Sequence, residues 1–115
     1  MGFFSGPSSS ILNKIALGYV SALMEHRLIL SMSTSPEEKS DLLKKSGLPN
    51  HRDQLNIQVA IEVSKLGVGW LKRNQFLGMI QGNALAMGFS KTDARYFKES
   101  VEMAFTAYQQ ATRGL

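Results

Sequence analysis

Hydrophobic residues recur at helical spacing along most of this chain, and the clearest example is the stretch from residue 91 to residue 113. Ser90 and Asp93 form an approximate capping box at its start, because the Ser90 hydroxyl can accept a hydrogen bond from the Asp93 amide. Gly114 supplies a stop signal. Between these signals, side chains three and four residues apart form the predicted core face of the helix: Ala94, Phe97, Val101, Ala104, Tyr108 and Ala111.

A second row of mostly apolar residues lies beside the first on this predicted helix. At about 100° per residue, the two rows cover an arc of about 200°, whereas about 100° is enough to dock a helix on one core. The helix is therefore either central and buried on two sides, or its second row contacts a partner chain or a ligand. The second interpretation gives a candidate partner interface formed by Tyr96, Ser100, Met103 and Ala107.

Four more segments carry helix signals. A serine run at residues 8–10 offers N-caps for a first long helix, and Ser35, Pro36 and the glutamates that follow are typical of the start of a second, short one. Gly47 and Gly88 mark helix ends. The predicted helices span residues 11–31, 36–46, 51–66, 70–87 and 91–113.

The segment at residues 55–63 fits two patterns. Every second residue is apolar, which is typical of a strand: Leu55, Ile57, Val59, Ile61 and Val63. A lone strand needs a partner edge, and the only other candidate, residues 28–32, is weak. A helix is favoured, with a strand at 55–63 as the alternative. As a helix, the segment would bury one row with Leu55, Val59, Val63 and Leu66 and a second row with Ile57 and Ile61.

Small residues recur four apart in the fourth predicted helix. Each glycine inside a helix costs about 1 kcal/mol relative to alanine, and close approach of another backbone is a common reason for it. The first predicted helix carries a matching short row. We therefore predict a tight crossing of the first and fourth helices, with a simple helix kink as the alternative. The residues of this crossing are Gly18, Ala22, Gly78, Gly82 and Ala86.

These elements predict an all-α protein, an irregular bundle of four long helices and one short connecting helix. The chain has 115 residues, which suits one domain with a modest core. Its hydrophobic content of 43% is ordinary for a globular chain. Residues 1–10 are rich in Gly, Pro and Ser and predict a flexible leader, and residues 11–115 form the predicted single helical domain.

The chain offers few residues for catalysis or metal binding. It has no cysteine, which excludes disulfides, thiolate metal sites and cysteine nucleophiles. Its two histidines, His26 and His51, show no metal-site spacing with carboxylates, and no phosphate-binding loop or nucleophile motif occurs. We therefore expect a cytoplasmic, non-enzymatic protein with no catalytic residue, no metal and no cofactor.

Positive charge is concentrated in one part of the chain. The net charge is +4, and no acidic residue occurs between Glu62 and Asp93. A single basic patch in this region would favour an acidic partner such as nucleic acid. The candidate patch is formed by Lys65, Lys72, Arg73, Lys91, Arg95 and Lys98.

Two functions follow as hypotheses. The excess apolar surface of the last helix favours a protein-protein interaction module of the adaptor, regulator or inhibitor type, which self-associates as a homodimer through that helix. The alternative is a nucleic-acid-binding protein that uses the basic patch within residues 65–98. No segment is long and apolar enough for a membrane span of about 20 residues.

Overall fold

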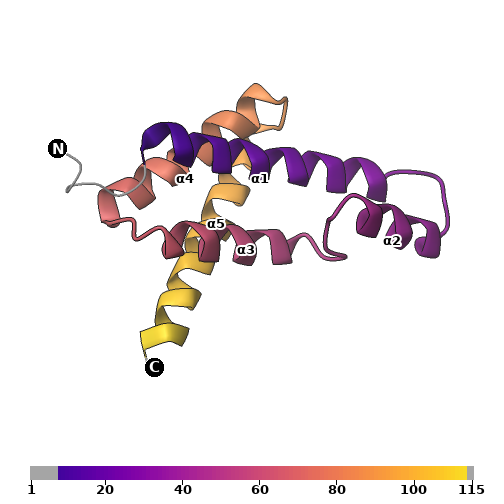
Figure 1. Cartoon of the computed structure of the whole chain (residues 1–115). Helices are drawn as coiled ribbons and strands as arrows, with labels where there is room; N and C mark the ends of the chain where they lie inside the picture. Colours follow the sequence, from indigo (N-terminus) through magenta and orange to yellow (C-terminus); the bar gives the residue numbers. More distant parts are fainter. Residues whose placement is uncertain (1–7, 114–115) are drawn as a thin grey trace.

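The computed structural model describes residues 8–113 and folds them into five helices with no strand among these residues (Figure 1). The predicted all-α bundle of four long helices and one short helix is confirmed. The strand alternative is wrong, because residues 55–63 lie inside the third helix. The helices are α1 (Ser9–Leu30), α2 (Pro36–Lys45), α3 (Asp53–Lys65), α4 (Trp70–Ala86) and α5 (Lys91–Arg113).

Serine side chains cap three of these helices at their first turns. The Ser8, Ser35 and Ser90 hydroxyls accept from backbone amides three residues later, at 3.2, 3.1 and 3.0 Å. Because Ser8 is the cap, α1 begins two residues earlier than predicted. Most of the predicted leader, residues 1–7, lies outside the described residues. Gly47 and Gly88 follow α2 and α4 with φ of 72° and 97°, a conformation that favours glycine.

α5 runs across the direction of α1 and α3 (Figure 1). α1 and α4 lie side by side and run in the same direction, since the Ser9 hydroxyl accepts from the Gln75 amide and the Asn13 amide oxygen accepts from Asn83. α3 runs the other way, and α5 passes between these elements and packs on α3 and α4 (Figure 1). None of the described helices is both long and apolar enough to cross a membrane.

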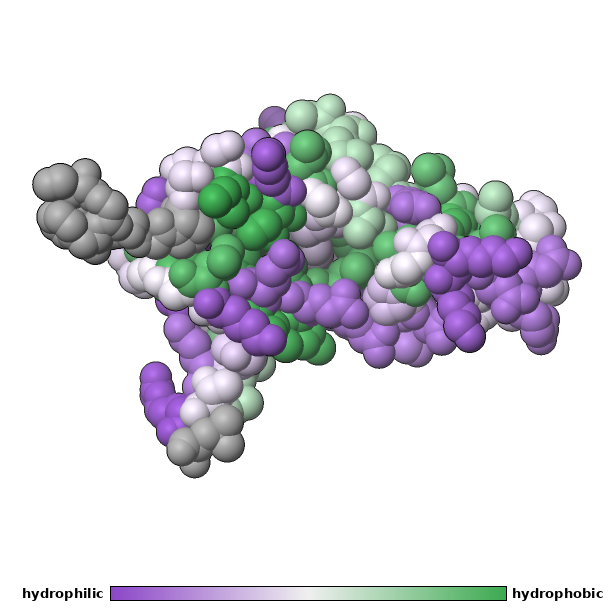
Figure 2. All heavy atoms as spheres, viewed as in Figure 1, coloured by the Kyte–Doolittle hydropathy of each residue, from purple (hydrophilic) through white to green (hydrophobic). Residues whose placement is uncertain are grey.

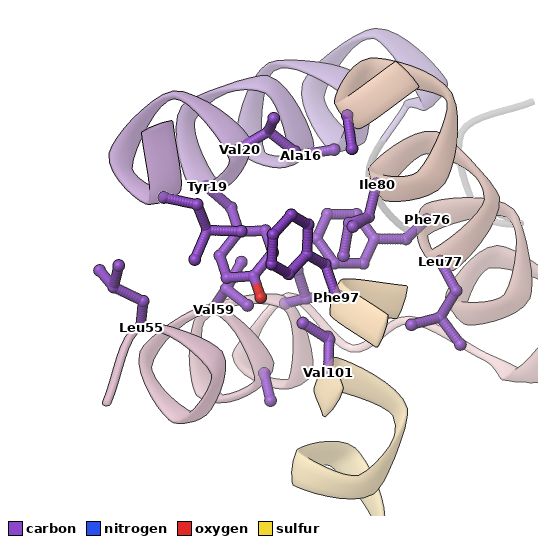
Figure 3. Packing of buried hydrophobic residues seen from close by; sticks show 14 of the residues in the cluster. Ala16, Tyr19, Val20, Leu55, Val59, Phe76, Leu77, Ile80, Phe97 and Val101 are labelled. Atoms are coloured by element: carbon purple, nitrogen blue, oxygen red, sulfur yellow. The ribbon is translucent and has the colours of Figure 1, made fainter. Parts of the chain in front are cut away.

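One hydrophobic core joins α1, α3, α4 and α5 (Figure 3). Three phenylalanines dominate it, Phe76, Phe97 and Phe105, each at most 2% exposed. The rings of Phe76 and Phe105 meet edge to face with centroids 6.2 Å apart, and Phe89 meets Phe97 in the same way at 4.9 Å. Such pairs add to the free energy gained by burial alone. The core therefore fixes α5 across the other three helices.

In α3 the predicted first row is largely buried and the predicted second row is not. Leu55, Val59 and Val63 lie in the core, whereas Ile57 is 53% exposed. The expected burial of this second row is therefore wrong at Ile57, whereas Ile61 is half-buried. Asn56 and Ala60 occupy the buried positions instead. Asn56 tolerates burial because its side-chain oxygen accepts a hydrogen bond from the Tyr19 hydroxyl.

α1 and α4 do pack together, but not through their glycines. A Cβ atom added at Gly18, Gly78 or Gly82 would meet no atom within 4 Å. The glycine-mediated tight crossing is therefore wrong. The small-residue row of α4 lies on the side opposite its buried residues, and Ala86 at its end is exposed, whereas Ala22 of α1 is half-buried. The buried face of α4 consists of Phe76, Leu77, Ile80 and Ala84.

Candidate functional site

A cleft of about 510 Å³ lies where the end of α1, the α2–α3 connection and the first part of α5 meet. Its apolar wall includes Leu23 and Phe97. Its polar wall brings together both histidines of the chain and two arginines. The polar residues of the cleft are His26, Arg27, Ser31, Asn50, His51, Arg52 and Asp53.

His26 connects α1 to the α2–α3 connection from a buried position. The residue is 2% exposed, and its Nε2 lies 3.2 Å from the Asn50 carbonyl oxygen. Because a carbonyl only accepts, Nε2 is the donor in this contact. The Asn50 side chain in turn accepts from the Ser40 hydroxyl at 3.3 Å. The cleft wall is thus held by contacts from α1 and α2.

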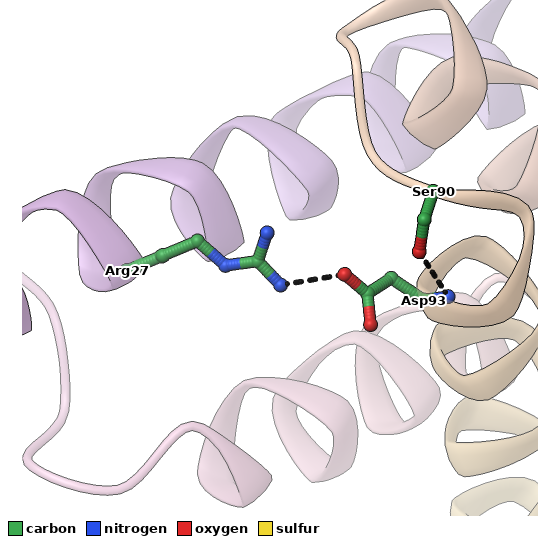
Figure 4. A network of polar contacts seen from close by, with 3 residues as sticks. All are labelled: Arg27, Ser90 and Asp93. Carbon is green, nitrogen blue, oxygen red and sulfur yellow. Dashed lines mark hydrogen bonds and ion pairs between the residues drawn. The ribbon is translucent and has the colours of Figure 1, made fainter.

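Arg27 spans from α1 to the start of α5 (Figure 4). Its guanidinium donates to the Asp93 carboxylate at 2.9 Å and lies 4.5 Å from the centre of the Phe89 ring. The Asp93 amide donates to the Ser90 cap, so the ion pair rests on a well-defined helix start. Both side chains are 39–45% exposed, which makes this a surface pair worth up to about 1 kcal/mol.

Arg52 is the other cation of the cleft, and its guanidinium lies over two aromatic rings. Its guanidinium carbon lies 5.2 Å from the Tyr96 ring centre and 5.8 Å from that of Phe97. Within residues 8–113 the only ion pair is Arg27–Asp93, so the Arg52 charge has no carboxylate partner there.

The described residues hold no group of three His, Asp or Glu side chains able to bind a metal ion. Sequence spacing missed the cleft altogether. His26, Arg52 and Phe97 come from different elements, so no local pattern could have joined them. The only sequence signals in this region were the predicted end of the first helix and the predicted start of the third, which both border the cleft.

The four residues of the predicted partner interface lie along one side of α5. Met103 is 72% exposed, Tyr96 is 47% exposed, Ala107 is exposed and Ser100 is half-buried. The interpretation that α5 is buried on two sides is therefore wrong. Its buried row ends at Phe105, and Ala111 is exposed because the end of α5 extends beyond α3 and α4 (Figure 1). Met103 and Ala107 border a shallow groove on this helix.

The six residues of the predicted basic patch do not form one continuous surface. Lys65, Lys72 and Arg73 lie around the α3–α4 connection, whereas Lys91 and Arg95 lie at the opposite end of α4. The 17 residues of α4 span about 25 Å. Arg73 also stacks on Phe105 at 5.6 Å, and half-buried Lys98 lies two turns before that ring. The predicted basic patch is therefore divided into two groups of residues, one near each end of α4.

Comparison with known proteins found no family model, no curated protein and no solved structure that matches this chain. Function must therefore be inferred from the surfaces of the fold.

Proposed function

We propose that this protein is a non-enzymatic interaction module that self-associates through the outer face of α5, which we define as Tyr96, Glu99, Met103, Ala107 and Gln110. The observation that carries the proposal is the exposure of Met103, a flexible apolar side chain that is 72% exposed in the middle of a 23-residue helix. Methionine is common at adaptable protein-binding surfaces because it fits irregular partners. Tyrosine is likewise enriched at interfaces.

The charges on this face allow a two-fold pair with its axis at Met103. In such a pair the two copies of α5 run antiparallel. A residue on the axis contacts its own equivalent, and the residue four positions before it faces the residue four positions after it in the second copy. Glu99 would then face the small side chain of Ala107 of the second copy. An axis near Glu99 would instead oppose two carboxylates. The axis at Met103 is therefore the arrangement that brings apolar atoms together without like charges.

The expected interface is small, because each copy contributes one helix face. Stable interfaces bury about 1,200–2,000 Å² in total, and smaller ones are transient. We therefore expect reversible association in the micromolar range. Such association can bring other attached or bound groups together, as adaptors and regulators do.

Sedimentation velocity over a concentration series tests the proposal. Met103→Glu and Met103→Lys should each give a monomer at concentrations where the natural chain dimerises, because like charges then meet on the axis. An equimolar mixture of the two variants should recover the dimer. That recovery is specific to a contact between identical positions, and a partner that is not a second copy would not produce it.

The matched control is Leu71→Glu, since Leu71 is 74% exposed and lies on α4. This variant should dimerise like the natural chain. A natural chain that stays monomeric throughout the series would overturn the proposal, as would two charged variants that both still dimerise.

A further inference from the structure

Three apolar side chains are exposed together at the α3–α4 connection, and we call them the apolar tip. Leu66 is 41% exposed, Trp70 is 66% exposed and Leu71 is 74% exposed. They belong to a short segment between the end of α3 and the first turn of α4. Figure 2 shows hydrophobic surface at this end of the molecule, where α1 and α4 begin. Single exposed apolar residues are ordinary, whereas a group at one end indicates a contact surface.

The rim of the apolar tip is basic. Lys65, Lys72 and Arg73 flank it in the sequence, and there is no acidic residue between Glu62 and Asp93. Lys72 is half-buried, and its ammonium group donates to the Ser9 hydroxyl at 3.3 Å. Its aliphatic part therefore lies along the protein while the charge stays near the surface. The tip thus combines exposed apolar side chains with flanking charges that are all positive.

We propose that the apolar tip docks on the surface of an anionic lipid bilayer, with Trp70 and Leu71 entering the headgroup region. Tryptophan favours this region because its ring is largely apolar and its N–H is polar. Each nearby lysine or arginine adds attraction to anionic headgroups. A second copy fits this tip poorly, because two basic rims would face each other. No helix enters the bilayer core in this arrangement.

The site is separate from the outer face of α5. The tip lies where α4 begins, and the nearby Arg73 contacts α5 through the buried Phe105, whereas Met103 is 72% exposed and lies on the other side of α5 from Phe105. The inference therefore does not rest on self-association, and either one can fail alone.

Trp70 is the only tryptophan in the chain, so its fluorescence reports on the apolar tip alone. We expect its emission to shift to shorter wavelength when the full chain is mixed with vesicles of phosphatidylserine and phosphatidylcholine. Acrylamide quenching should fall at the same time, and the protein should sediment with the vesicles. Vesicles of phosphatidylcholine alone should produce none of these changes, and high salt should reverse them.

Two variants keep the tryptophan reporter and test the parts of the tip. Leu71→Ser should weaken binding about tenfold, because it removes most of one apolar side chain from the contact. Lys65→Gln should weaken it about fivefold, in line with the loss of one charge near an anionic surface. Met103→Glu is the control and should bind as the natural chain does. Far-ultraviolet circular dichroism checks that each variant is folded.

Three results would overturn the proposal. The first is an unchanged emission with anionic vesicles at low salt. The second is a shift that depends on protein concentration without lipid, which would mean that a second copy covers Trp70. The third is equal binding to neutral and anionic vesicles, which would remove the role of the basic rim.

Discussion

Tyr19 and Asn56 form the one polar contact that is buried in the core between α1 and α3. The two residues are 5% and 7% exposed, and the Tyr19 hydroxyl donates to the Asn56 side-chain oxygen (Figure 3 shows the Tyr19 ring directed toward α3). Burial raises the pKa of the Tyr19 hydroxyl, so the phenol keeps its proton and its role as donor. No buried side-chain polar atom in the described residues lacks a partner.

Tyr19→Phe should lower the free energy of unfolding by about 1–3 kcal/mol, because it leaves the buried Asn56 oxygen without its donor. Urea unfolding followed by circular dichroism measures the loss. Tyr96→Phe is the control, since Tyr96 is 47% exposed and water can replace its contacts. Equal stability of the two variants would show that the buried bond does not contribute.

The same variant should change the response to alkali. The pKa of Tyr19 is raised in the folded chain above the ordinary value of about 10, so its contribution to stability is present below that pH and is lost as pH rises. The natural chain should therefore lose stability above about pH 10 more steeply than Tyr19→Phe. In an absorbance titration, one tyrosine of the natural chain should ionise only as the chain unfolds, and the variant should lack that step.

At the scale of single helices, capping and termination signals are local and strong. Ser35 and Ser90 cap α2 and α5 as their sequences predict, and Gly47 and Gly88 follow α2 and α4 with positive φ. In contrast, the sequence of a single helix does not decide which of its faces is buried. The glycines of α4 show this, because their spacing predicted a contact that the packing does not make.

Gly78→Ala and Gly82→Ala should each raise the free energy of unfolding by about 0.5–1 kcal/mol. Both positions are inside α4, where alanine is the better helix former, and a Cβ atom there would meet nothing within 4 Å. Thermal and urea unfolding measure the gain. Gly88→Ala is the contrasting control and should destabilise, because its φ is 97°. A loss of stability in the first two variants would instead support a tight crossing of α1 and α4 at these glycines.

At the scale of the whole molecule, the helices are unequally supported. The radius of gyration is 15.2 Å, whereas about 13 Å is typical for a compact domain of this length. Two parts account for the extended shape. One is α2, which packs mainly on α1, and the other is the end of α5 beyond the core. Only Leu43 of α2 is buried. The core is therefore concentrated in α1, α3, α4 and the part of α5 up to Phe105.

Amide hydrogen exchange should reveal this difference directly. We expect the amides of α2 to exchange faster than those of α3, because α2 buries little apolar surface and can open without disturbing the core. The last turns of α5, after Phe105, should behave like α2. The middle of α1 provides the internal reference for the stable core. Protection of α2 equal to that of α3 would contradict this description of the fold.

The sequence alone determined the approximate limits of the helices in the described chain, but it left residues 55–63 open between a helix and a strand until the structure placed them in α3. The limits were predictable because caps, glycine stops and apolar periodicity act within a few residues, and these signals agree with one another. It also identified the first part of the row of α5 that enters the core, Ala94, Phe97 and Val101. These features need no knowledge of neighbouring helices.

Only the tertiary structure decided which of two rows on a helix is buried. Asn56 lies in the core and Ile57 is exposed because Tyr19 approaches α3 from one side. The cleft of His26 and Arg52, the division of the basic residues and the exposed apolar tip have the same origin. Each depends on where distant segments meet, and periodicity along one helix carries no information about that.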